Sequence, residues 1–343
     1  MTGRRAGKST GTAHEPERKS YMSVQKGIAV LTALVFCLFA GAAALAQESY
    51  GPVRVLIPVT GGLEKGSLSK LMQDVAGIIE KESGYKFVYS EATYRMGDDD
   101  SKLVADAFRA KKAEMTYIRS YELISREDEW KGLFKPAFMF IFDGTNSQEE
   151  CFYVLEKSGM KTIKDLRGKT WGGSRTYVPR LILHENGIDE PLSQFFGNTK
   201  YVEDAPPAKS IQALRNGTID VVSVNKHHLA IGGAGVMSEG DDKEKSMLKY
   251  KAIACAPGEL NWVFAFRKDV PDDVVQKITK VFVTAHKSEA FKPIRFIFTA
   301  IKGGFSSIKE SDFKRTRELA ALTKKFGWDK EQVVFTKEKR DKK

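Results

Sequence analysis

The stretch that decides the fold is residues 53–90, VRVLIPVTGGLEKGSLSKLMQDVAGIIEKESGYKFVYS. It opens on an apolar run with few polar breaks, which is typical of a strand buried in a parallel sheet. A glycine-rich turn follows, and apolar residues then recur at helical spacing up to Gly84, where a helix is expected to end. Residues 85–90 predict a second strand. The stretch is therefore a strand–helix–strand unit.

The same alternation continues along the chain. Further strands are predicted at residues 114–118, 151–156, 169–172, 219–224, 250–256 and 262–267. Helices are predicted around residues 103–108, 178–186, 211–216, 271–288 and 311–326. This order predicts an α/β fold with parallel sheets. Ligands of such sheets bind beyond the carboxyl ends of the strands, which here means residues 58–67, 117–121, 172–177, 223–228 and 256–261.

The first 46 residues are interpreted as an N-terminal extension and signal peptide. Lys26 precedes an apolar run over residues 27–45, and the run ends in Ala-Leu-Ala at residues 44–46, so cleavage is expected after Ala46. The alternative is a retained membrane anchor, although the most apolar part is short for a bilayer span. Met22 is an alternative start to Met1. We expect the mature protein to be exported to the periplasm.

Part of the positive charge of the chain lies in its two terminal segments. The formal charge is +11, and the leader holds six of the Lys and Arg and two of the Asp and Glu, which leaves +7 for the mature chain. The C-terminal residues 337–343, KEKRDKK, hold part of the remainder. Basic residues do not interleave with aromatic ones in any nucleic-acid-binding motif, so no nucleic-acid partner is expected. The charge suits a small anionic ligand or a negatively charged partner surface.

Removal of the leader leaves two cysteines, Cys151 and Cys255. An even pair in an oxidising compartment favours a disulfide, and two buried thiols are the equally weighted alternative.

Several segments, in this order, resemble the periplasmic binding proteins of phosphonate and phosphite ABC transporters. They are LVADAFRAKKAEMTYIRSYELI, CFYVLEKSGMKTIKDLRGKTWGG, VPRLILHENGI, SIQALRNGTIDVVSVN and SSIKESDFKRTREL, and the resemblance as a whole extends over nearly all of residues 53–319. The resemblance implies a type II periplasmic-binding-protein fold. In that fold, two α/β lobes with mixed sheets are joined by two crossover strands and close on a ligand like a hinged clamp.

The resemblance also implies a domain division. Lobe one is expected at residues 50–149 plus 260–343, and lobe two at residues 150–259. The crossings would fall near residues 151–155 and 254–262, so both remaining cysteines would lie at the hinge. On this basis we expect a Cys151–Cys255 hinge disulfide.

The family holds its anion with hydroxyls at the start of a helix, where unpaired N–H groups favour negative charge. The matching loop here contains Ser174, Arg175 and Thr176, of which Arg175 is new to the pattern and suited to a carboxylate or phosphate. Helix capping by the hydroxyls, with a solvated arginine, is the alternative. The other predicted ligand-binding residues are Tyr121, Tyr94, Asn225 and Asn261.

One departure concerns the ligand itself. The family's phosphonate-contacting histidine is absent from residues 202–210, VEDAPPAKS, and the hydroxyl loop is about two residues shorter. The expected ligand is therefore a small anion, phosphonate-like, phosphate-like or another oxyanion, delivered to an ABC-type membrane permease by a monomer. No cofactor and no metal site are predicted.

Signals for an enzyme are weak. Ser174 lacks a G-x-S-x-G elbow, and Ile188 stands where an H-E-x-x-H motif starting at His184 would need its second histidine. We therefore expect a solute-binding protein and no catalysis. The alternative function is a ligand-sensing module that presents its bound state to a membrane receptor.

Overall fold

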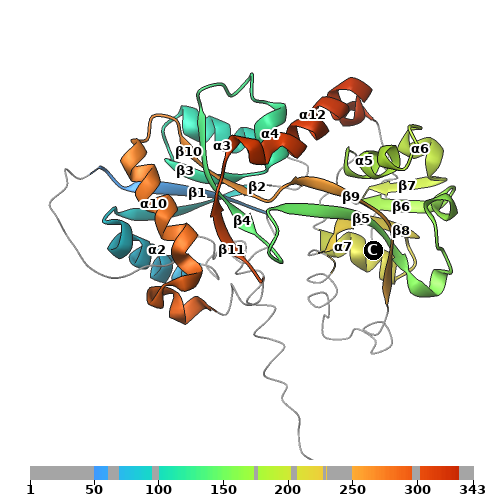
Figure 1. Cartoon of the computed structure of the whole chain (residues 1–343), viewed down its shortest axis with the longest axis horizontal. Helices are drawn as coiled ribbons and strands as arrows, with labels where there is room; N and C mark the ends of the chain where they lie inside the picture. The colour runs from blue at the N-terminus through green and yellow to red at the C-terminus, as the bar shows by residue number, and fades with distance from the viewer. Residues whose placement is uncertain are drawn as a thin grey trace, which may run out of the picture.

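The computed structural model contains two β-sheets that lie side by side along the long axis of the molecule (Figure 1). It describes residues 50–60, 69–94, 100–173, 177–201, 207–226, 229, 249–295 and 302–331. The predicted leader, residues 1–46, lies outside the described residues.

The first sheet has the strand order β11-β4-β10-β3-β1-β2. Its strands are β1 (Val53–Thr60), β2 (Phe87–Tyr94), β3 (Met115–Ile118), β4 (Phe134–Ile141), β10 (Val263–Arg267) and β11 (Gly304–Ser307). Strand β1 pairs in parallel with β2 on one side and β3 on the other. Strand β10 runs antiparallel to both β3 and β4, so the sheet is mixed.

The second sheet repeats this plan with the order β7-β6-β8-β5-β9. Its strands are β5 (Ser147–Leu155), β6 (Thr170–Gly173), β7 (Asn198–Tyr201), β8 (Val221–Asn225) and β9 (Tyr250–Leu260). Strand β6 lies between two parallel neighbours, β7 and β8, and β5 is antiparallel to both β8 and β9. Each sheet thus has a parallel triplet next to an antiparallel strand.

The chain passes between the sheets twice. It leaves the first sheet after Ile141 and enters the second at Ser147, and it returns between Leu260 and Val263. A disulfide joins Cys151 of β5 to Cys255 of β9, two directly paired residues whose Cα atoms are 4.1 Å apart. Both cysteines belong to the strands that run between the two halves of the molecule in Figure 1.

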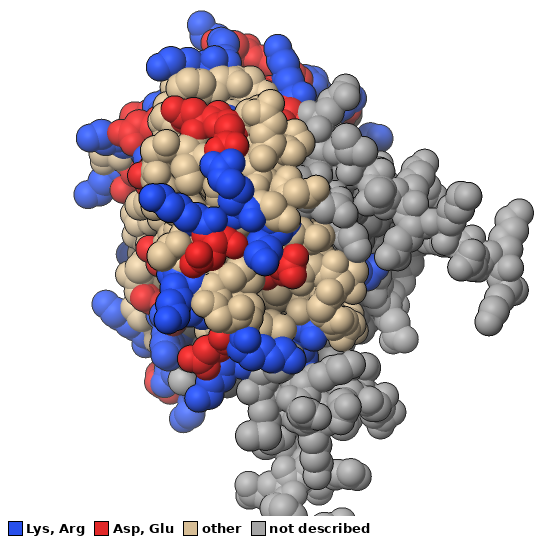
Figure 2. Space-filling model, turned by 90° about the vertical axis from the view of Figure 1, so that its right-hand side faces the viewer, with Lys and Arg blue, Asp and Glu red and all other residues tan. Residues whose placement is uncertain are grey.

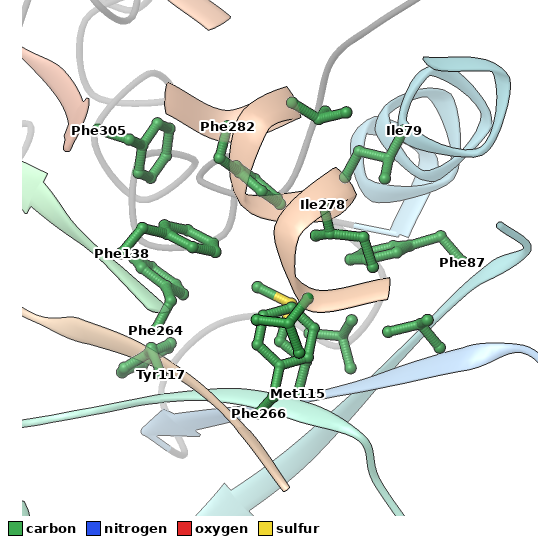
Figure 3. Packing of buried hydrophobic residues seen from close by; sticks show 14 of the residues in the cluster. Ile79, Phe87, Met115, Tyr117, Phe138, Phe264, Phe266, Ile278, Phe282 and Phe305 are labelled. Carbon is green, nitrogen blue, oxygen red and sulfur yellow. The ribbon is translucent and has the colours of Figure 1, made fainter. Parts of the chain in front are cut away.

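Helices cover both faces of the first sheet. Successive side chains of a strand point to opposite faces, so alternate residues of one strand pack against different helices. Phe264 and Phe266 of β10 pack with helices α2 (Ser69–Ser83) and α10 (Asp272–Thr284) in a phenylalanine-rich core (Figure 3). Val263 and Ala265, the alternate residues, pack with helices α3 (Asp100–Arg109) and α4 (Ser120–Ser125).

The second sheet is covered in the same way. Phe152 and Val154 of β5 pack with α5 (Tyr177–Glu185) and α6 (Leu192–Phe195), and the alternate residues Cys151 and Tyr153 pack with α7 (Pro207–Arg215). The described residues also form short 3-10 helices: η1 (Glu156–Ser158), η2 (Ile163–Leu166), η3 (Ala285–Lys287), η4 (Glu289–Ile294), η5 (Glu310–Phe313) and η6 (Trp328–Lys330).

Helix α12 (Lys314–Phe326) joins the two halves a third time. Phe313, just before the helix, is buried with the first sheet, whereas Leu319 and Trp328 are buried in the core of the second sheet. Figure 1 shows α12 running from α4 toward α5. The division predicted from the sequence, which groups residues 260–343 with the first lobe, stays a prediction.

The predicted fold class, two mixed α/β sheets of the type II arrangement, is confirmed. Three strands were not predicted. Strand β4 carries Lys135 and Pro136 and reads as irregular, β7 is short, and β11 contains only Gly304, Phe305, Ser306 and Ser307. The alternation of strands and helices predicted the parallel strands, and the family resemblance implied the mixed sheets that the structure has, in which β10 and β5 are antiparallel to their neighbours. No helix in the part of the chain that the structure describes has the length and apolarity of a membrane span.

The disulfide makes a simple prediction for the mature chain starting at Gln47. Alkylation with iodoacetamide in denaturant should add no mass before reduction and two carbamidomethyl groups after it, because the chain then contains only Cys151 and Cys255. Intact-protein mass spectrometry reads the result. Any adduct on the unreduced chain would show that the two sulfurs are not joined.

Candidate functional site

The parallel strands of both sheets end toward the centre of the molecule. Strand β1 lies between β2 and β3, and β6 lies between β7 and β8. In each sheet the next two parallel strands in sequence are therefore added on opposite sides of the first, so the strand order reverses there. Such points are where open α/β sheets bind ligands, beyond the carboxyl ends of the strands. The candidate site is therefore the region between the two sheets, next to the carboxyl ends of β1 and β6 and to the strands that connect the sheets (Figure 1).

The end of β6, just before α5, is closely packed. Strand β6 ends at Gly173, and α5 begins at Tyr177. A Cβ atom on Gly173 would lie 2.5 Å from Cζ2 of Trp171 and 2.8 Å from Oγ of Ser223, so only glycine fits there. Trp171 donates from Nε1 to the same Ser223 hydroxyl at 3.1 Å. The predicted ligand residues Ser174, Arg175 and Thr176 lie outside the described residues.

Tyr121 is packed against the start of α5. Its ring stacks on that of Tyr177, with 4.1 Å between the ring centroids and 14° between the planes. The side chain is 8% exposed, and burial raises the pKa of Tyr121 to about 12. The structure thus brings Tyr121 next to the first residue of α5, and it gives the ring a packing role. Ligand contact by Tyr121 stays a prediction.

A buried carboxylate lies beside this stack. Glu259 of β9 is 7% exposed. Its Oε2 accepts from the backbone N–H of Tyr121 at 2.8 Å and from the Ser120 hydroxyl at 3.2 Å, and its Oε1 accepts from the Tyr177 hydroxyl at 3.1 Å. Ser120 Oγ also lies 3.4 Å from Oγ1 of Thr316 in α12. Ser120 and Tyr177 lie within the predicted ligand-binding stretches 117–121 and 172–177 but were not singled out there, and Thr316 lies outside every predicted stretch.

Asn225 and Tyr94 occupy strand ends in different sheets. Asn225 is the last residue of β8, is 2% exposed and pairs with Glu150 of β5. Tyr94 is the last residue of β2 and pairs with Thr60 of β1, while the placement of its side chain is not described. Strands β1 and β3 separate β2 from β10, so Tyr94 belongs to the outer part of the first sheet.

Asn261 lies at the return crossing. Its Nδ2 donates to the carbonyl oxygens of Phe140 and Thr145, both at 2.9 Å, which ties the two crossings together. Its Oδ1 is buried and accepts no hydrogen bond within the described ranges. The next residue, Trp262, stacks on Tyr117 of β3 at 5.3 Å between centroids. These contacts give Asn261 a structural role, and its contact with ligand stays a prediction.

The described residues include one group with the spacing of a metal site, Glu149, Cys151 and Cys255. The two sulfurs are bonded to each other, which leaves the carboxylate of Glu149 as the one free ligand of the three. Figure 2 shows the end of the molecule formed by the second sheet, where Lys and Arg are interspersed with Asp and Glu. Positive charge is therefore not gathered into one patch on the described part of this face.

A family model described as the periplasmic substrate-binding protein of phosphonate ABC transporters matches residues 62–313. Three solved structures are similar in fold. A binding protein component of an ABC phosphonate transporter from Pseudomonas aeruginosa is 14% identical over 81% of this chain and 88% of that one, with a TM-score of 0.58. PhnD1 from Prochlorococcus marinus, in complex with methylphosphonate, is 13% identical over 80% of this chain and 98% of that one, with a TM-score of 0.57.

The third is the periplasmic aliphatic sulphonate binding protein SsuA from Escherichia coli, 11% identical over 81% of this chain and 93% of that one, with a TM-score of 0.51. At these identities the structures show the fold alone. A comparison with curated protein sequences gave no match.

Proposed function

The chain belongs to the family of periplasmic substrate-binding proteins of phosphonate ABC transporters, and from this premise we propose that it captures a small oxyanion between its two sheets and delivers it to an ABC-type permease. The family is one of transport proteins without a catalytic step. The proposed ligand carries a phosphonate, phosphate or other oxyanion group, and the protein acts as a monomer exported with its leader removed after Ala46.

The observation that carries the proposal is the start of α5. The helix is nine residues long, is separated from the end of β6 by three residues and follows a strand that lies between two parallel neighbours. A helix N-terminus presents unpaired N–H groups and a partial positive charge, which together favour an anion. The intervening sequence Ser174-Arg175-Thr176 adds two hydroxyls and a guanidinium. We place the head group of the ligand against these residues.

The remaining proposed contacts surround this head group. Asn225 ends β8 in the same sheet, and Tyr121 packs on the first residue of α5. Asn261 has a buried acceptor, Oδ1, that is unpaired in the described part and suits a hydroxyl or amine donor. Tyr94 is proposed to contact the ligand from the first sheet. The histidine that meets phosphonate in the family has no counterpart in residues 202–210, so Arg175 is proposed to supply the missing charge.

A thermal-shift screen tests the function. A ligand that binds only the folded protein raises its melting temperature with ligand concentration. The mature chain should be stabilised by at least one of methylphosphonate, phosphite, phosphate, an alkanesulfonate or a dicarboxylate. Glucose and putrescine, which are uncharged and cationic, serve as controls and should cause no shift. Stabilisation by a control alone would contradict an anion-binding function.

Replacement of Arg175 by alanine should weaken binding of the best anion by about 10- to 100-fold, because it removes a charged, two-pronged hydrogen-bond donor. Arg175→Lys keeps the charge without the fork and should recover only part of the loss. Isothermal titration calorimetry measures both. Arg167→Ala is the matched control, since Arg167 is an exposed arginine of the same half that pairs with Glu190. Unchanged affinity in Arg175→Ala would remove the head-group site from this loop.

A further inference from the structure

Glu259 is the residue at which elements from both sheets converge. It lies in β9, one residue before the chain returns toward the first sheet. Ser120 and Tyr121 come from α4, which follows β3 of the first sheet, and Tyr177 begins α5, which follows β6 of the second. One carboxylate accepts hydrogen bonds from all three, at 3.2, 2.8 and 3.1 Å.

On the side of the first sheet, Glu259 caps the N-terminus of α4. The residue before α4, Arg119, makes no side-chain cap, and an arginine has no acceptor with which to make one. Oε2 of Glu259 accepts the backbone N–H of Tyr121 in the first turn of α4. A carboxylate at that position also has the favourable sign for the helix dipole. Glu259 therefore caps α4 from a strand 138 residues away in sequence.

The second-sheet side fixes the start of the proposed anion site. The Tyr177 hydroxyl donates to the other oxygen of Glu259, and Tyr177 directly follows residues 174–176. The ring of Tyr177 also stacks on Tyr121. Contacts between the described residues that fix the α5 N-terminus relative to α4 thus include one that passes through the carboxylate and one that passes through the rings.

We propose that Glu259 is a positioning residue that couples the start of α5 to α4 of the first sheet. This inference rests on the proposed function, because the proposed function places the ligand at the start of α5 and the coupling fixes that helix end relative to the first sheet. The coupling itself exists with or without ligand. A change at the Tyr177 hydroxyl should therefore be felt at α4, across the boundary between the sheets.

The test is amide hydrogen exchange of the ligand-free mature protein, read by mass spectrometry. In Tyr177→Phe the stacked ring remains and only the hydroxyl is lost. We expect exchange to become about tenfold faster in the peptide spanning α4 as well as in that spanning the start of α5, the size expected for one hydrogen bond to a charged group. Glu259→Gln, which removes the charge and one acceptor, should accelerate exchange in both peptides further.

Tyr153→Phe is the matched control. Tyr153 lies in β5 of the second sheet and is 7% exposed, the same as Tyr177, but it packs in the α7 layer away from Glu259. Its replacement should leave exchange in α4 unchanged. Acceleration confined to α5 in Tyr177→Phe, or equal acceleration of α4 in Tyr153→Phe, would overturn the coupling.

The ligand arm separates this inference from the proposed function. With methylphosphonate and inorganic phosphate as probes, Tyr177→Phe should weaken whichever binds the wild type by about tenfold. Wild-type protein that binds no anion in the screen would count against the proposed function, while the exchange experiment would still decide the coupling. Faster exchange at α4 with unchanged affinity would overturn the role of Glu259 in positioning the site.

Discussion

Replacing Trp328 with alanine is expected to lower the free energy of unfolding by about 4 kcal/mol, the upper range for loss of a buried aromatic side chain. Trp328 follows α12, the last α-helix within the described residues, yet it is 1% exposed and belongs to the core of the second sheet with Leu181 and Phe195. The guanidinium of Arg180 lies over its ring, 5.6 Å from the centroid. Urea denaturation followed by circular dichroism measures the change.

Phe326→Ala is the control for this prediction. Phe326 belongs to the same segment and stacks on Trp328 at 5.5 Å between centroids, but it is 40% exposed. Its loss should cost no more than about 0.5 kcal/mol, as is usual at the surface. If both variants lost the same small amount, the C-terminal segment would not be part of the second core. The assignment of α12 as a third connection between the sheets would then be wrong.

Replacing Glu114 with glutamine is expected to cost about 2 to 3 kcal/mol at neutral pH, since a buried carboxylate would be removed from two arginines. Glu114 is 3% exposed and accepts from Arg54 Nε at 2.8 Å and from Arg267 Nη1 at 3.1 Å. The backbone N–H of Arg54 donates to the same carboxylate at 2.8 Å. The estimate is below that for a fully buried pair because the Arg54 side chain is 42% exposed.

The same cluster predicts a pH dependence. Burial alone would raise the pKa of Glu114, but hydrogen bonds from Arg54 and Arg267 and the charge of Arg54 outweigh burial and hold the pKa below its usual range. The stabilisation is therefore present above the pKa of an unfolded glutamate, about 4.3, and is lost as pH falls through the lower folded value. The difference between wild type and Glu114→Gln should accordingly shrink between pH 5 and pH 2, about the range in which such a group titrates.

Glu127→Gln provides the comparison for Glu114→Gln. Glu127 also pairs with an arginine, Arg317, but its side chain is 56% exposed. Exposed ion pairs contribute about 0 to 1 kcal/mol, so this variant should unfold almost as the wild type does. Equal losses of unfolding free energy in the two variants would show that burial of the Glu114 cluster does not increase its contribution to stability.

Regular elements were predictable where one local signal decided them. Gly84 and Gly187 end helices α2 and α5 with φ angles of 75° and 74°, as glycines beyond a helical pattern predict. Strand β4 was missed because Pro136 interrupts its pattern, and prolines are rare inside strands. The structure accommodates it where the pairing with β10 shifts register, between Phe264 and Ala265. That compensation involves a strand more than a hundred residues later, which no local pattern reveals.

The site divides in the same way. The position of the loop before α5 follows from a strand, a glycine and a helix that are adjacent in sequence. The bond between Tyr177 and Glu259 joins residues 82 positions apart, and the Ser120–Thr316 contact spans 196. Such contacts depend on how the two sheets and α12 are assembled. One amino-acid sequence by itself has no local pattern from which such long-range contacts could be derived.

The most direct test of the central claim is a crystal structure of the mature protein with the anion that gives the largest thermal shift. We predict that the anion lies between the two sheets, with its charged oxygens within hydrogen-bonding distance of residues 174–177 and the start of α5. An anion held elsewhere, for example among surface lysines, with the α5 N-terminus unoccupied, would contradict the account.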